Sequence, residues 1–144
     1  MASIRSQILD YIVDQLDAIP GVNAVRSRLV PVRREEGTRV IVSWAGETAV
    51  QGFHDSVERT LTVKVNIIAR GDIPDQVADA VAVKCYAKLN SSATISKMGG
   101  LAFIPIVEDS RTPSMEDTDD GAVDYEVLFT VVYHTTVASE ESQP

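Results

Sequence analysis

Residues 3–19 repeat their apolar side chains every three or four positions, which is the spacing of an amphipathic helix. Ser3 can accept hydrogen bonds from the first free backbone N–H groups of such a helix. Proline and glycine at positions 20 and 21 then end the pattern, because neither residue readily continues a helix. We therefore predict a first helix over residues 3–19, with one face packed on a core.

A second helical pattern covers residues 73–90. Asp72 can serve as its N-cap and Asp75 stands three residues later, an arrangement similar to a capping box. The apolar stripe of this helix repeats every four residues, through Val77, Val81, Cys85 and Leu89. The cysteine is thus expected to be a small core residue rather than a nucleophile or redox thiol, since buried free cysteines are common and unreactive.

Two longer segments alternate apolar and polar residues, the pattern of strands with one buried face. In residues 57–69 the apolar positions are Leu61, Val63, Val65 and Ile67. In residues 122–137 they are Tyr125, Val127, Phe129, Val131 and Tyr133. Leu128 and Val132 lie on the opposite face of this last strand, which suggests that another subunit covers part of it.

Shorter strands are expected between the first helix and the long alternating segment. Residues 22–33 and 38–45 favour two strands joined by a polar turn at 34–37, and the second is rich in β-branched residues. Pro31 cannot donate to a β-ladder, so the first strand is expected at an edge or interrupted there. Residues 46–56 hold two glycines and little periodicity, and we predict a loop for them.

Residues 101–109 indicate another short strand, interrupted by Pro105, and a polar loop over 110–121 connects it to the last strand. The resulting order is α-β-β-β-α-β-β. It predicts an α+β fold in which two helices pack on one face of a mainly antiparallel sheet.

No linker or shift in composition divides the chain, so residues 1–144 are expected to form a single domain. The polar tail over residues 138–144 is expected to be frayed.

The charge of the chain excludes several classes of partner. It has 21 acidic and 13 basic residues, for a formal net charge of −8 over 144 residues. Proteins that grip nucleic acid or anionic membranes do so through excess lysine and arginine, which this chain lacks. A single cysteine excludes a disulfide within the chain, and no segment resembles a signal peptide or a membrane span. The sequence therefore predicts a soluble protein of the cell interior.

The sequence offers no recognisable catalytic or metal-binding motif. It lacks a nucleophile elbow, a phosphate-binding glycine loop and a zinc-binding histidine pair. His54 stands four residues before Glu58, which would suit a weak metal pair only on a helix, and we expect a solvated loop histidine instead. His134 is expected to lie at a surface or a contact. The acidic run at 116–121 does not fit a calcium loop, since its glycine and glutamate positions do not match. We predict a protein that is not an enzyme and that needs no cofactor.

The charges are unevenly distributed along the chain. Residues 26–39 contain five arginines against two glutamates, and residues 108–126 contain eight carboxylates against one arginine. Opposite patches on one chain suit a head-to-tail contact between copies, although ordinary surface charge is the alternative reading. The candidate interface residues are Arg26, Arg28, Arg33, Arg34, Arg39, Glu116, Asp117, Asp119 and Asp120.

The succession of elements resembles the tail-terminator (minor tail) proteins of long-tailed bacteriophages and prophages. The resemblance begins with the first helix, IRSQILDYIVDQLDAI, and a PGV turn into an arginine-containing strand. It continues through the alternating strand ERTLTVKVNIIARG and the helix DIPDQVADAVAVKCYAKL to the last strand, YEVLFTVVYHTT. It covers nearly the whole chain as a pattern of elements and hydrophobic positions, with no short diagnostic motif.

This resemblance implies a structural role in the virion, with assembly in the host cytoplasm. Members of the family form a hexameric ring that caps the head-proximal end of the tail tube, ends its polymerisation and offers a surface for head-completion proteins. The implied partners are therefore other copies of the chain, the tail-tube protein and a head-completion protein. DNA passes through the ring without specific binding. The family supplies no catalytic residues to carry over.

Three alternatives remain open at the level of the sequence. The chain could be another neck or tail-completion protein of similar architecture. It could also be a small enzyme whose site forms at a subunit interface from Arg33, Arg39, Asp117 and Asp119. A small regulatory or ligand-binding domain is the third. Whether the loops at 46–56 and 108–121 become ordered on assembly is not determined by their composition.

Overall fold

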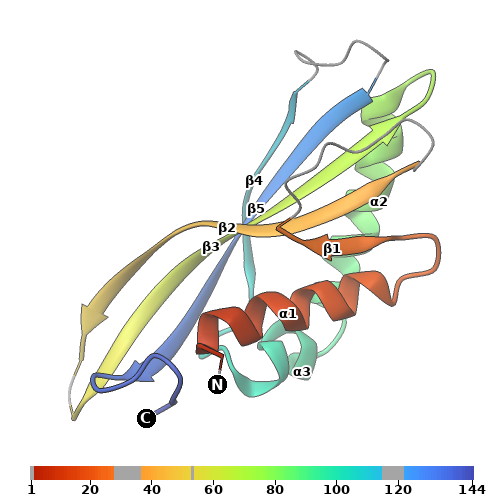
Figure 1. Ribbon diagram of the computed structural model, residues 1–144. Coiled ribbons are helices and arrows are strands. Elements are labelled where there is room, and N and C mark those ends of the chain that lie inside the picture. The colour runs from red at the N-terminus through yellow and green to blue at the C-terminus, as the bar shows by residue number, and fades with distance from the viewer. Residues whose placement is uncertain (1, 28–36, 53, 115–121) are drawn as a thin grey trace.

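A five-stranded sheet covered on one face by helices forms the framework of the protein, as a computed structural model shows (Figure 1). The structure describes residues 2–27, 37–52, 54–114 and 122–144. Its elements are α1 (Ile4–Asp17), β1 (Ala24–Arg26), β2 (Arg39–Gln51), β3 (Ser56–Arg70), α2 (Pro74–Leu89), α3 (Ala93–Ser96), η2 (Met98–Gly100), β4 (Val107–Ser114) and β5 (Ala122–Thr136).

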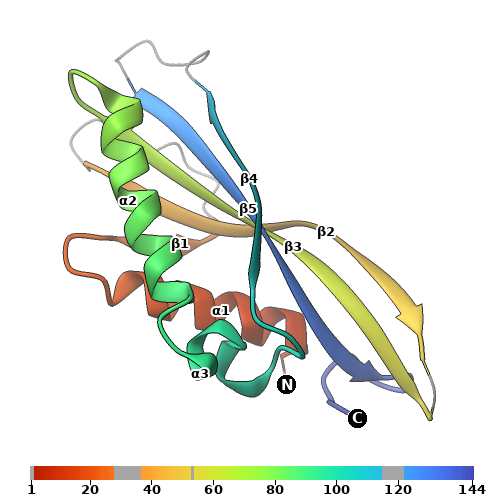
Figure 2. The ribbon, with the colours of Figure 1, turned by 180° about the vertical axis from the view of Figure 1, so that it is seen from behind.

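The strands lie in the order β1-β2-β3-β5-β4, and every pair is antiparallel except β1 with β2. The two long helices lie on the same side of this sheet and contact each other (Figure 2). The predicted α+β class is therefore confirmed, with its helices on one face of a mainly antiparallel sheet. A short helical segment, α3 with η2, is added between α2 and β4.

The core lies between the helices and one face of the sheet. Alternate residues of β3 and β5 are buried there, as their alternation predicted, and Val40 and Val42 of β2 join them. The α1 side chains that meet them are Ile4, Ile8, Leu9, Ile12 and Leu16. Each fully buried aliphatic side chain of this kind stabilises the fold by about 1.5–3 kcal/mol. This apolar layer fixes the position of the sheet under the helices.

Helix α2 buries Cys85 and Leu89 of the predicted stripe, together with Ala78 and Ala82, which were expected to broaden it, whereas Tyr86 is exposed. Its buried residues are Pro74, Ala78, Ala82, Cys85 and Leu89, whereas Val77 is exposed. Small alanines allow the helix to approach the sheet closely, and Cys85 is buried as expected. The predicted capping box at Asp72 is wrong, because the helix begins after Ile73 with Pro74 in its first turn, where a missing N–H costs nothing.

Three predicted connections differ from the observed ones. β1 covers Ala24–Arg26 and runs parallel to β2, so these residues do not form the predicted hairpin with it; residues 28–36, which include the rest of the predicted first strand and most of its turn, lie outside the described residues. The predicted loop at 46–56 is mostly strand, because β2 continues to Gln51 and β3 begins at Ser56. The predicted strand at 101–109 is displaced to β4. Ala102 bridges to Tyr133, and the chain pairs with β5 again only from Val107.

The C-terminal tail is held against the body, although it was expected to be frayed. The Ile4 backbone N–H donates to the Glu140 carbonyl at 2.9 Å, and the Thr136 N–H donates to the Ser142 carbonyl at 2.9 Å. The Gln143 amide donates to the carbonyls of Gly100 and Leu101, each at 3.2 Å. The tail thus accepts backbone hydrogen bonds from α1 and β5 and donates side-chain hydrogen bonds to the segment that follows α3.

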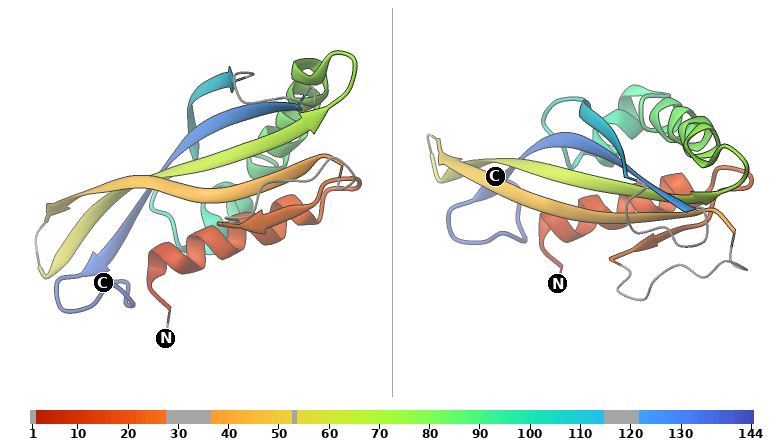
Figure 3. Two further views of the ribbon diagram at one scale, coloured as in Figure 1. Left: turned by 45° about the horizontal axis from the view of Figure 1, so that its top comes forward. Right: turned by 90° about the horizontal axis from the view of Figure 1, so that it is seen from above.

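One end of the sheet extends beyond the two long helices. The extension, which we call the arm, comprises residues 46–51 of β2, 56–62 of β3 and 130–136 of β5 (Figures 1 and 3). The start of α1, the C-terminal tail and residues 102–103 lie close to it (Figure 1). The rest of the sheet, packed against α1 and α2, is called the covered half below.

Candidate assembly surface

The predicted basic patch is only partly visible in the structure. Arg26 lies on β1, where its Nη1 donates to Ser6 Oγ at 2.7 Å and to Asp10 Oδ1 at 3.0 Å. Arg39 begins β2, and its Nη1 donates to the Thr38 carbonyl at 3.1 Å. Both guanidinium groups thus have partners within the chain. The other predicted members, Arg28, Arg33 and Arg34, lie outside the described residues.

The predicted acidic candidates, Glu116, Asp117, Asp119 and Asp120, also lie outside the described residues. Four other carboxylates of the acidic segment are described, and each has a neighbour within the chain. Asp124 accepts from Asn66 at 2.8 Å, Asp109 accepts from Thr130 at 2.7 Å, Glu126 lies 3.8 Å from Lys64, and Glu108 pairs with Arg111. These contacts within the chain leave the four carboxylates of the β4–β5 region less available to a partner.

The described residues do not bring catalytic groups together. Burial raises the pKa of the Cys85 thiol to about 11, so it is protonated and unreactive at neutral pH. No cluster of three or more His, Cys, Asp or Glu side chains suitable for a metal occurs in the described part of the chain. His54 is exposed in the turn between β2 and β3, as expected. His134 stacks on Phe103 with ring centroids 4.5 Å apart, a surface contact as predicted.

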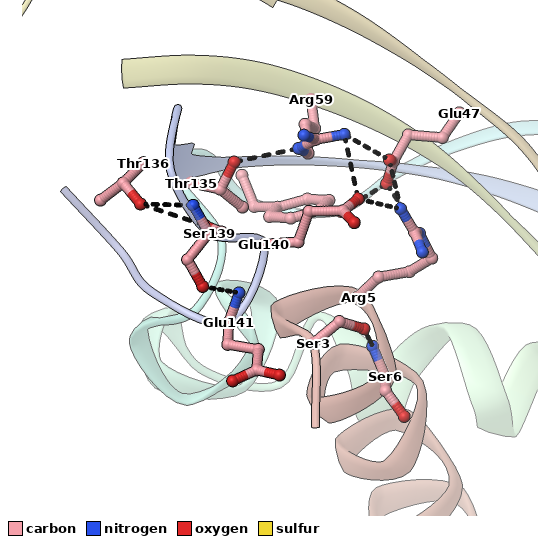
Figure 4. Close-up of polar contacts among 11 residues, drawn as sticks. Ser3, Arg5, Ser6, Glu47, Arg59, Thr135, Thr136, Ser139, Glu140 and Glu141 are labelled. Atoms are coloured by element: carbon pink, nitrogen blue, oxygen red, sulfur yellow. Dashed lines mark hydrogen bonds and ion pairs between the residues drawn. The ribbon is translucent and has the colours of Figure 1, made fainter. Parts of the chain in front are cut away.

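The most elaborate polar cluster surrounds Glu47 at the base of the arm (Figure 4). Arg5 of α1 donates to both carboxylate oxygens of Glu47, at 3.2 and 2.8 Å. Arg59 of β3 donates to the same carboxylate at 3.2 Å, and the Tyr133 hydroxyl also donates to it. Glu140 of the tail pairs with both arginines, at 3.1 and 3.4 Å. The cluster therefore links β2, β3, β5, α1 and the tail.

A β-bulge explains why Glu47 faces the helices. Trp44 pairs with Val63, but Gly46 pairs with Thr62, so Ala45 is an extra residue in β2. Before the bulge the even-numbered residues of β2 face the core, and after it the odd-numbered residues do. Glu47 consequently lies opposite the buried Leu61, on the inner face of the sheet. This change could not be predicted from the residue pattern, because the bulge interrupts the alternation from which strands are recognised.

The electrostatics of the cluster favour an ionised Glu47. Burial alone would raise the pKa of this carboxyl, but hydrogen bonds from Arg5, Tyr133 and Arg59 outweigh it and hold the pKa below its ordinary value. The hydrogen bond to Glu47 raises the pKa of Arg5, and burial together with the same carboxylate raises the pKa of Tyr133. Because its carboxylate accepts four hydrogen bonds, Glu47 is a structural anion rather than a proton acceptor. It holds the base of the arm on α1.

The sheet face away from the helices is open. Its side chains are half-buried by one another, including Leu128 and Val132, whose apolar character led us to expect a covering subunit. A shallow hollow of about 440 Å³ lies on this face, lined partly by Ile41, Lys64 and Ile68. None of the helices in the described part of the chain is long and apolar enough to cross a membrane. The accessible features are thus sheet surfaces and sheet edges rather than an enclosed pocket.

Comparison with known proteins gives little further information. No protein-family model matches the chain, and no curated protein matches it either. Among solved structures, one known by a sequence identifier alone is similar at 19% identity and a TM-score of 0.46. The alignment covers 89% of this chain and 92% of the other. A likeness at this level carries no argument about function.

Proposed function

We propose that this chain is a structural protein of a bacteriophage virion that caps the head-proximal end of the tail tube as a ring, formed from six copies. Such a ring ends tube polymerisation and forms the surface to which the head joins. The proposal rests on the resemblance of the element order to tail-terminator proteins. The observation that supports it best is the arm, which extends a long sheet beyond its helices and is anchored to α1 through Glu47.

An anchored arm with open edges suits contacts between proteins. Its backbone edge and exposed side chains can pair with another chain, whereas a catalytic site would need converging reactive groups and a recess. The net charge of −8 is also compatible with a channel that DNA crosses, because a wall that gripped phosphates would retain the DNA. In this role the chain needs neither a cofactor nor a catalytic residue.

Electron microscopy of the purified protein, alone and mixed with separately assembled tail tubes, tests the proposal. We expect rings about as wide as the tube and caps at one end of each tube, with no further tube growth from capped ends. Particles that join heads to finished tails without binding tube ends would instead identify another neck protein. A protein that neither forms rings nor binds tubes would contradict the proposal.

A further inference from the structure

The C-terminal tail, residues 138–144, lies on the molecule with little apolar packing. Ser139 is half-buried, and the other residues of the tail are exposed. The Thr136 N–H donates to the Ser142 carbonyl, and two hydrogen bonds join Thr136 to Ser139, so the chain turns back after β5 (Figure 4). Segments with few buried apolar contacts and solvent-exposed hydrogen bonds open at a lower free energy than the core. We therefore expect the tail to open while the sheet and the helices stay folded.

The carboxylate of Glu140 is the charged contact between this tail and the body. It lies 3.1 Å from Arg5 Nη2 and 3.4 Å from Arg59 Nη1 (Figure 4). The Glu140 side chain is 53% exposed, whereas those of Arg5 and Arg59 are 20% and 17% exposed. Hydrogen bonds to Glu47 hold both guanidinium groups in place. The two arginines are thus a fixed part of the arm base, and Glu140 meets them from the solvent side.

The charges of this cluster balance only when Glu140 is in place. The two guanidinium groups share the buried carboxylate of Glu47, so an open tail leaves one positive charge of the cluster without a counterion. An anion that accepts hydrogen bonds stabilises such a partly buried cation, and the planar guanidinium group is suited to a carboxylate. The position that Glu140 occupies therefore favours a carboxylate over a neutral side chain.

Opening of the tail also frees backbone groups around this charge. The N–H groups of Ile4 and Thr136 lose their acceptors, and the carbonyls of Gly100 and Leu101 lose the Gln143 amide. Ile4 is the first residue of α1, where a backbone N–H has no acceptor within the helix. Together with the guanidinium groups, these donors and acceptors suit an extended peptide that carries an acidic side chain.

We infer that Arg5 and Arg59 form a carboxylate-binding site, which the tail fills through Glu140 in the free chain and from which an acidic segment of a partner displaces it. Because the tail is tethered, its effective concentration at the site is high, and a partner has to bind by more than one carboxylate to replace it. The inference rests on contacts within the chain and does not depend on the capping of a tail tube.

Trp44 provides a reporter for this site. It is the only tryptophan of the chain, and the guanidinium carbon of Arg5 lies 4.6 Å from its ring centroid. Glu140→Ala removes the carboxylate and keeps the tail, so free acetate can enter in its place. We expect sodium acetate to shift the Trp44 fluorescence of Glu140→Ala saturably toward the wild-type spectrum, beyond the effect of sodium chloride at equal ionic strength. The wild type and the matched control Glu141→Ala should bind acetate at least about fivefold more weakly, since Glu140 still fills their site.

A peptide with the sequence of residues 137–144, VASEESQP, tests whether an acidic segment takes the same place. It should bind Glu140→Ala and produce the same fluorescence change. The peptide with glutamine in place of the glutamate that matches Glu140 should bind about twofold to fivefold more weakly, the range of an exposed ion pair. Hydrogen exchange measures the opening: the amides of Ile4 and Thr136 should exchange faster by a similar factor in Glu140→Ala than in Glu141→Ala, while the β3 amides are unchanged.

Several results would overturn the inference. Equal responses of Glu140→Ala and Glu141→Ala to acetate, or a response that chloride reproduces, would indicate a general effect of salt. Equal affinity for the two peptides would show that the arginines do not recognise the carboxylate. Loss of the folded circular-dichroism spectrum in Glu140→Ala would make the tail part of the fold rather than a displaceable segment. None of these measurements requires tail tubes, so a failure of capping and a failure of this inference are distinguished.

Discussion

The covered half of the sheet and the arm belong to the same three long strands but are stabilised by different interactions. The covered half is packed on both long helices by aliphatic and aromatic side chains that solvent does not reach. In the arm, β2 is largely exposed, and a buried carboxylate with two arginines and the Tyr133 hydroxyl adjoins the last buried apolar residues, Leu61 and Val131. Apolar packing is non-directional, whereas this cluster fixes the arm through directed hydrogen bonds.

This difference has a consequence for assembly. A protein that must present an edge strand to a partner cannot bury that strand in its own core. The β2 strand of the arm is accordingly exposed over residues 48–51, and its orientation depends on the Glu47 cluster at its base. Substitutions in the two regions distinguish stabilisation by apolar packing from stabilisation by the Glu47 cluster.

Phe129→Ala in the covered half should cost the most stability, about 3–5 kcal/mol, because it removes a fully buried aromatic ring and leaves a cavity. Urea unfolding followed by circular dichroism measures the loss. The matched substitution in the arm, Val50→Ala, should change stability by no more than about 0.5 kcal/mol, since its side chain is already exposed. Similar losses at the two sites would mean that the arm contributes to the core.

Glu47→Ala should destabilise the protein by about 2–3 kcal/mol, because it leaves Arg5, Arg59 and the Tyr133 hydroxyl without their common acceptor. The same urea titration provides the measurement. Glu126→Ala removes a looser pair with Lys64 on the open face and should cost less than about 1 kcal/mol. An effect of Glu47→Ala no larger than this control would contradict the role of the cluster.

Acid should weaken the arm before it weakens the core. Because the folded pKa of Glu47 lies below its ordinary value of 4.5, its contribution is complete above that value and is lost as the pH falls through the folded pKa. Glu47→Gln removes this titration while keeping the size of the side chain. The unfolding free energy of the wild type should thus fall more steeply than that of Glu47→Gln below about pH 5. Parallel pH profiles for the two proteins would show that Glu47 is not the group responsible.

Glu140→Gln should have the smallest effect, about 0–1 kcal/mol, since its ion pairs with Arg5 and Arg59 are open to solvent. Its signature should be local. The tail should become more susceptible to limited proteolysis while the unfolding midpoint hardly moves. A loss as large as that for Glu47→Ala would make the tail, rather than the buried carboxylate, the main anchor of the arm.

The covered half could be predicted from the sequence because the periodicity of its apolar residues is not interrupted. The odd-numbered residues of β3 and β5 are buried without interruption, and the α1 periodicity ends cleanly at Pro20 and Gly21. Alternation and helical spacing both report burial against a continuous core. The α+β fold class follows from these elements.

The β2 part of the arm could not be predicted, because this stretch is not amphipathic in the usual way. Residues 48–51 are all exposed, whichever face they lie on, so they carry no alternation. Glu47, the central residue of the cluster, stood in a segment predicted to be a loop. Its partners are 12, 42 and 86 positions away in the chain, separations that local patterns do not report. The charge pattern, by contrast, predicted Arg26 and Arg39 as interface residues. Both have hydrogen-bond partners within the chain.

The extra residue at Ala45 also bears on how this chain can change by insertion and deletion. Alanine and glycine at 45 and 46 look like a tolerant loop, in which the loss of one codon would be harmless. Here the loss of Ala45 would keep every later pair, because Gly46 would still lie opposite Thr62 and Glu47 opposite Leu61. It would instead remove the bend and the added twist that a bulge introduces into a strand. A one-residue change in length at this point would thus alter the direction of the arm without exchanging its inner and outer surfaces.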